Sequence, residues 1–129
     1  MSDDPYQRWV SINLPHARTV AARIGRSLEA LGAFGAAGNG GAQGLAQAYD
    51  AVEQALRGYD EVPPLEEAIR AADLVAERGR QLVAAIARTP VRSDRLGQHV
   101  RNLFECLGLA DEGRELALAC GERPDSPLR

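Results

Sequence analysis

Residues 64–88, PLEEAIRAADLVAERGRQLVAAIAR, decide the fold class of this chain. Apolar side chains recur every three or four positions along this stretch, at Leu65, Ile69, Ala72, Val75, Leu82 and Ile86. That spacing places them on one side of an α-helix. Pro64 suits the first helical position, and Glu66 and Glu67 suit the first turn, where the helix dipole favours negative charge. Thr89-Pro90 ends the helix, because a residue before proline disfavours helical backbone.

Gly79 lies on the apolar stripe of this helix, where it costs about 1 kcal/mol relative to alanine. A glycine in this position indicates either a second helix that crosses closely or a bend in the helix itself. The sequence leaves both explanations open.

Similar periodicity marks the rest of the fold. We expect a first helix from an N-cap at Asn13 with Pro15 in its first turn, a second over about 43–58, a fourth capped by Ser93 or Asp94, and a short fifth capped by Asp111. No stretch shows the alternation typical of a strand. The sequence therefore predicts an all-α fold, a compact antiparallel bundle of four main helices plus a short C-terminal helix.

The chain has the length of a single domain, with 129 residues of which 45% are hydrophobic. We expect an N-terminal arm at 1–12, one helical-bundle domain at 13–120, and a C-terminal tail at 121–129. Five glycines fall within residues 35–44, which predicts a flexible loop inside the domain.

The net charge of −3 disfavours a protein that binds nucleic acid over its whole surface. The charge is segregated, however. Residues 35–67 carry one arginine and six acidic residues, whereas residues 68–101 carry seven arginines and three acidic residues. The 68–101 segment is therefore a candidate contact for nucleic acid phosphates, or for an acidic surface on another protein or a second copy of the chain.

Several classes of site have no support in the sequence. Cys106 and Cys120 occur in no zinc-binding pattern, and no Glu-x-x-His pair is present, so we expect no metal and no cofactor. No apolar run approaches the ~18 residues of a membrane span. The polar, acidic N-terminus differs from a secretion signal, and two cysteines in such a chain suggest reduced thiols, so we expect a cytoplasmic protein.

His99 is the residue most suggestive of chemistry, because it lies among Arg92, Arg95 and Arg101. The spacing of Arg92 and His99 resembles the arginine–histidine motif of the HEPN family, small helical-bundle proteins that include metal-independent ribonucleases. Ser93 matches the polar residue that often follows the family's arginine, whereas Arg101 stands where an aromatic residue is frequent. The resemblance implies that Arg92 or Arg95 neutralises a phosphate and that His99 transfers a proton.

No catalytic residue is assigned outside that resemblance, which covers only a few positions. The leading hypothesis is a non-enzymatic helical interaction protein, either an adaptor, a regulatory subunit or a small assembly subunit. The alternative is a nucleic-acid-associated protein, as a subunit of a ribonucleoprotein complex or as a HEPN-like ribonuclease. The candidate partner-binding residues are Tyr6, Trp9, Arg88, Arg92, Arg95 and Arg101.

Overall fold

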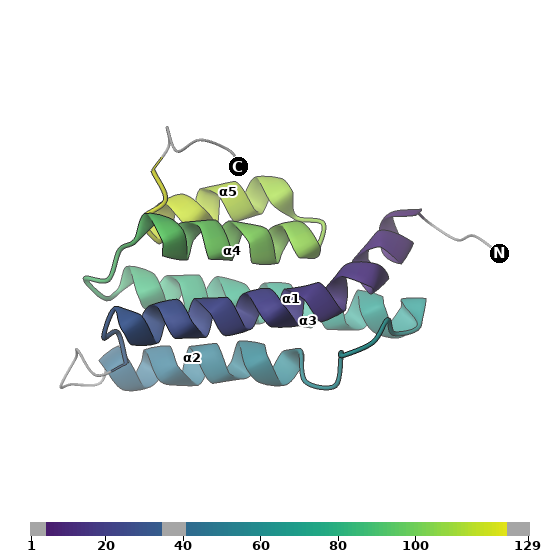
Figure 1. The fold of residues 1–129 in the computed structure, drawn as a ribbon, viewed down its shortest axis with the longest axis horizontal. Coiled ribbons are helices and arrows are strands. Elements are labelled where there is room, and N and C mark those ends of the chain that lie inside the picture. The colour runs from purple at the N-terminus through teal and green to yellow at the C-terminus, as the bar shows by residue number, and fades with distance from the viewer. Residues whose placement is uncertain (1–4, 35–40, 124–129) are drawn as a thin grey trace.

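Five α-helices make up the part of the chain that the computed structural model describes, residues 5–34 and 41–123 (Figure 1). They are α1 (Pro5–Ala30), α2 (Gly41–Ala55), α3 (Leu65–Ala87), α4 (Asp94–Cys106) and α5 (Ala110–Ala119). Consecutive helices run antiparallel, with α2 on one side of α1 and the α4–α5 pair on the other. The predicted all-α bundle is confirmed.

The core is built almost entirely of aliphatic side chains, with Phe104 as the largest fully buried one. The apolar stripe of α3 faces this core, and Val75, Leu82 and Ile86 on it are buried. A Cβ atom on Gly79 would meet Cζ of Phe104 at 3.0 Å. The glycine on the stripe of α3 therefore makes room for the Phe104 ring of α4, which supports the close crossing rather than the bend.

The first helix begins earlier than the sequence predicted. α1 starts at Pro5, so residues that we expected in an N-terminal arm are helical. Asn13 is not an N-cap, because its side-chain amide donates a hydrogen bond to the Trp9 carbonyl, 2.8 Å away, one turn earlier in the same helix. The helix passes through Pro15, which lacks an N–H and crowds the carbonyl four residues earlier. Figure 1 shows α1 bent near this end, as expected for an internal proline.

Two further boundaries differ from the prediction. Residues 41–44 belong to α2 rather than to the expected loop, and residues 35–40 lie outside the described part of the chain. α5 starts at Ala110 with Leu109 in the N-cap position, so Asp111 lies in the first turn and does not cap. The N-cap of α4 is confirmed as Ser93, whose hydroxyl accepts a hydrogen bond from the Leu96 backbone N–H.

Residues 121–123 were expected in an unstructured tail, but they pack against the start of α4. The Arg123 backbone N–H donates to a carboxylate oxygen of Asp94 at 3.0 Å. Gly121 has a φ of +113° and approaches the backbone of Ser93 so closely that a Cβ would lie 2.4 Å from its nitrogen. The chain after α5 is therefore part of the fold as far as Arg123, and the rest of the predicted tail lies outside the described residues.

Candidate functional site

The polar cluster around His99 is formed by α1 and α4 together. His99 and Arg95 lie one turn apart on α4, and the charges of Arg23, Arg95 and Arg26 act on the His99 imidazole. Burial, followed by these three positive charges, lowers the pKa of His99 below its ordinary value. His99 Nδ1 is buried and has no hydrogen-bond partner in the described part of the structure. The imidazole is therefore neutral near pH 7 in a strongly positive environment.

Arg92 does not join this cluster. Its guanidinium donates hydrogen bonds to the carbonyl oxygen of Ala87 at 3.1 Å, the last residue of α3, and to those of Thr89 at 2.9 Å and Val91 at 2.7 Å in the segment that follows. It thereby satisfies carbonyl groups that a helix end leaves without internal partners. The arginine–histidine resemblance paired Arg92 with His99, but the structure places Arg95 rather than Arg92 beside the imidazole.

The structure does not support the expectation that Arg101 contacts a partner. Only 9% of the residue is exposed, and its Nη2 lies 2.9 Å from Oε2 of Glu122, which is also largely buried. This ion pair attaches the segment after α5 to α4, although its geometry is not that of a hydrogen bond. The Arg101 guanidinium is therefore directed into the fold.

The other arginines of residues 68–101 are dispersed. Arg80 forms a two-pronged ion pair with Glu112 of α5, with Nη2 and Oε1 2.9 Å apart, and this contact lowers the pKa of Glu112. Arg88 is exposed at the C-cap of α3. Arg70 lies near Glu67 and Tyr59 at the opposite end of that helix. The described structure thus provides no continuous basic face along 68–101.

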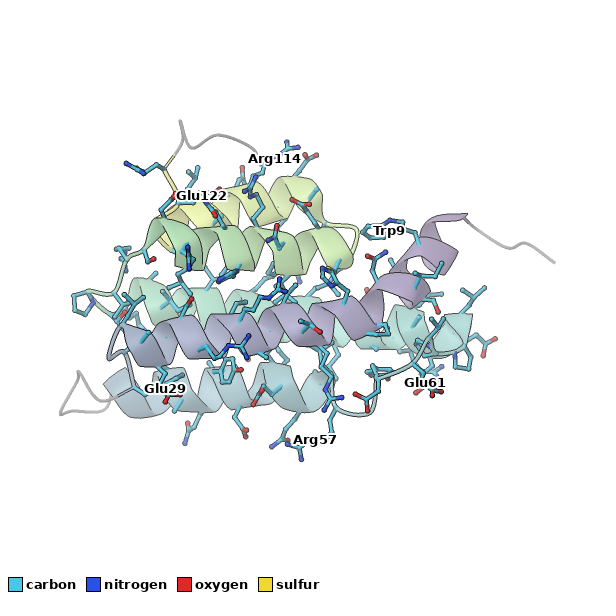
Figure 2. The ribbon with its side chains drawn as sticks, viewed as in Figure 1. Trp9, Glu29, Arg57, Glu61, Arg114 and Glu122 are labelled. Atoms are coloured by element: carbon cyan, nitrogen blue, oxygen red, sulfur yellow. The ribbon has the colours of Figure 1, made fainter. Side chains whose placement is uncertain are left out.

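Two neighbouring apolar side chains are exposed on the N-terminal part of α1. Trp9 is 42% exposed and Ile12 is 56% exposed, and their spacing of three residues puts them side by side on the helix surface. In the view of Figure 2, Trp9 lies between this part of α1 and the turn that joins α4 to α5. Val10 and Leu14 are buried in the core, so Trp9 and Ile12 occupy the outer side of the same helix. The Tyr6 side chain lies outside the described part of the structure.

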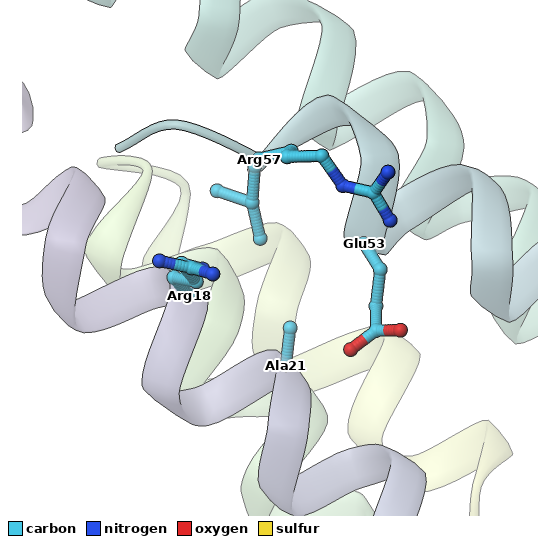
Figure 3. Close-up of a pocket in the computed structure, with 5 residues that line it drawn as sticks. Arg18, Ala21, Glu53 and Arg57 are labelled. Atoms are coloured by element: carbon cyan, nitrogen blue, oxygen red, sulfur yellow. The ribbon is translucent and has the colours of Figure 1, made fainter. Parts of the chain in front are cut away.

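A small pocket lies between α1 and α2, with a volume of about 80 Å³ (Figure 3). Arg18 and Ala21 of α1 line it, together with Glu53, Leu56 and Arg57 at the end of α2. Its volume is far below the roughly 300 Å³ of small ligand-binding sites. Arg18 also forms an ion pair with Asp60, which joins α1 to the α2–α3 connection.

The thiols and the acidic residues add no second site. Cys106 and Cys120 are both free and buried, and burial raises the pKa of Cys106 to about 11 and that of Cys120 to about 12. Cys106 ends α4, whereas the Cys120 carbonyl accepts from the Ser93 N–H just before α4 begins, so the two thiols lie at opposite ends of that helix. Within residues 5–34 and 41–123, no group of three or more histidine, cysteine and acidic side chains is arranged to hold a metal ion.

No helix of the described segments is both long enough and apolar enough to cross a membrane. No protein-family model, curated protein or solved structure matches the chain.

Two of the residues that surround His99 were missed by the sequence analysis. Arg23 and Arg26 lie off the apolar stripe of the first helix and resemble ordinary surface residues. Their spacing of three puts both on one side of α1, which was a readable signal. Which helix packs beside that side was not readable, because α4 is about 70 residues later in the sequence.

Proposed function

We propose that the protein is a non-enzymatic helical interaction protein, an adaptor, regulatory subunit or small assembly subunit of a larger complex. The observation that carries this proposal is the exposure of Trp9 and Ile12 as neighbours on the outer side of α1. A tryptophan and an isoleucine lose favourable burial energy when they stay in water, and contiguous exposed apolar residues mark contact sites on proteins. Tryptophan is also among the residues that contribute most binding energy to interfaces.

The local backbone supports this assignment. Ser11, between Trp9 and Ile12, is buried, and its hydroxyl donates to the Pro63 carbonyl before α3 at 2.5 Å. Val10 and Leu14 anchor the same helical segment in the core. The two exposed side chains are thus presented from a backbone that is held on its inner side, which lowers the entropic cost of binding a partner.

The cysteines support a proposal for the cellular setting. Two free thiols in one chain are typical of a reducing compartment, and we propose that the protein works in the cytoplasm. The partner is another protein or a second copy of this chain.

The test compares two charge substitutions at exposed apolar positions. Ile12→Glu puts a carboxylate on the α1 surface, and Leu118→Glu, at a residue that is 47% exposed on α5, is the matched control. Tagged wild-type protein is purified from cells that naturally produce it, and its stoichiometric partners are identified. We expect Ile12→Glu to lose the partner and Leu118→Glu to keep it. Loss with Leu118→Glu alone would move the interface to α5 and refute the proposal.

The nucleic-acid alternative retains support from Arg95 and His99, which lie together on α4. In a HEPN-like ribonuclease, Arg95 would neutralise the phosphate and His99 would transfer the proton. Incubation of the wild type and His99→Ala with a labelled single-stranded RNA tests this reading. Equal cleavage by the two proteins, or no cleavage by either, eliminates the ribonuclease.

A further inference from the structure

The junction of α1 and α4 brings four nitrogen-bearing side chains into one small area. α1 and α4 pack against each other in antiparallel directions, so the second half of α1 lies beside the first half of α4 (Figure 1). Arg23 and Arg26 come from that part of α1, and Arg95 and His99 come from that part of α4. Each pair spans about one helical turn of roughly 5.4 Å. The four groups therefore occupy a compact area rather than a long stripe.

The three arginines of this area form no ion pair with a carboxylate in the described residues. No hydrogen bond or ion pair joins the guanidinium of Arg23, Arg26 or Arg95 to any residue in the described part of the chain. Four other arginines are paired with carboxylates, in the contacts Arg18–Asp60, Arg80–Glu112, Arg101–Glu122 and Arg114–Asp111.

The acidic residue closest in sequence on α4 is Asp94, whose carboxylate is hydrogen-bonded to groups outside the cluster. Asp94 precedes Arg95, but one of its carboxylate oxygens accepts from the Gln98 side chain at 2.9 Å and the other from the Arg123 backbone. On α1, Glu29 follows Arg26 by three residues without forming an ion pair with it. The cluster therefore holds three guanidinium groups that repel one another and that form no ion pair in the described residues.

We propose that Arg23, Arg26, Arg95 and His99 form a binding site for a phosphate group that carries at least two negative charges. Guanidinium groups match the oxygen geometry of phosphate with paired, charge-assisted hydrogen bonds. The compact arrangement suits one compact anion better than an extended acidic peptide. The buried and unpartnered Nδ1 of His99 shows that this imidazole has hydrogen-bonding capacity that the described fold does not use.

This site is independent of the interaction surface proposed above, since it uses neither Trp9 nor Ile12. The phosphate source is either a small molecule, such as a pyrophosphate-bearing compound, or the backbone of RNA. Both sources present phosphate oxygens to the arginines. RNA carries many further phosphates outside the site, whereas a small molecule carries few or none.

The test measures the binding of inorganic pyrophosphate by calorimetry at low salt. Arg23→Gln and Arg95→Gln each remove one guanidinium from the site, whereas Arg57→Gln removes an exposed arginine on the opposite side of the bundle, beyond α2 (Figure 2). We expect each site variant to weaken binding by about tenfold, which is typical of one charged hydrogen-bonding group, and Arg57→Gln to leave it unchanged. In parallel, pyrophosphate should raise the pKa of His99, measured by NMR of the imidazole, because a bound anion favours the charged ring.

The same variants identify the source. Single-stranded RNA that binds more tightly than pyrophosphate, with the same loss in Arg23→Gln and Arg95→Gln, assigns the site to a nucleic acid backbone. Tighter binding of pyrophosphate than of RNA assigns the site to a small phosphate ligand. A glutamate-rich peptide that binds the cluster more tightly than either would refute a phosphate site. Absence of saturable pyrophosphate and RNA binding, or equal losses in Arg57→Gln and the site variants, would also refute it.

Discussion

Gly97 on α4 sets the distance between α4 and the end of α5, and its replacement by alanine gives a direct test of this packing. A Cβ at Gly97 would lie 2.6 Å from the Ala117 carbonyl oxygen and 2.6 Å from the Glu122 backbone nitrogen. Ordinary van der Waals contacts are longer, and both atoms belong to backbone. Because the Glu122 side chain pairs with Arg101, the segment cannot retreat without disturbing a buried ion pair.

The size of the effect follows from two opposing contributions. In an unhindered helix, alanine is more favourable than glycine by about 1 kcal/mol. Overpacking at a tight contact costs roughly 1–3 kcal/mol, and contact with backbone atoms favours the upper part of that range. We therefore expect Gly97→Ala to lower the free energy of unfolding by about 2 kcal/mol, or the melting temperature by about 8 °C for a domain of this size.

Urea unfolding followed by circular dichroism measures this loss. Gly44→Ala on α2 is the matched control, because nothing lies within 4 Å of the Cβ position there. The control should gain about 0.5–1 kcal/mol from helix propensity alone. If Gly97→Ala gained stability as Gly44→Ala does, the close packing of α4 on the end of α5 would be wrong.

Two further predictions concern titratable groups. The pKa of His99 is lower in the folded protein than in the unfolded chain, so the unfolded chain binds more protons below about pH 6.5. In phosphate-free buffer, the free energy of unfolding should fall as pH drops from 7.5 to 5.5, and His99→Gln should reduce that slope. An identical slope in the variant would show that His99 is not responsible. The buried thiols of Cys106 and Cys120, with pKa values of about 11 and 12, should resist alkylation by iodoacetamide at pH 8 until urea unfolds the chain. Mass spectrometry showing rapid modification of the native protein would contradict their burial.

Local sequence signals predicted the elements whose ends are set by their own residues. The apolar spacing along 64–88 identified α3, and Ser93 identified the start of α4, because stripe and cap are both properties of nearby residues. The start of α1 was predicted wrongly because Asn13 and Pro15 have the residue types that are typical of an N-cap and of the first helical turn. The burial of Val10 and Leu14, which extends the stripe through the proline, depends on contacts with the rest of the bundle.

The candidate sites show the same difference between features set by nearby residues and features set by long-range contacts. The sequence suggested Trp9, a large apolar residue in a polar stretch, and the structure shows that it is exposed beside Ile12. It also grouped Arg92, Arg95 and Arg101 around His99 because they are neighbours in the chain. In the fold, Arg92 is hydrogen-bonded to the end of α3 and Arg101 is paired with Glu122. Arg23 and Arg26 of α1 act on the His99 imidazole instead. These exchanges depend on helix pairing across long sequence separations, which a single sequence does not specify.

The most direct test of the interaction function places a photo-crosslinking amino acid at Ile12 or at Leu118 in cells that naturally produce the protein. Both positions are exposed, and they lie on α1 and α5 respectively. We expect a defined crosslinked product from Ile12, with a second protein or a second copy of the chain, and none from Leu118. No product from Ile12, or the same products from both positions, would contradict the claim that this side of α1 is the binding surface.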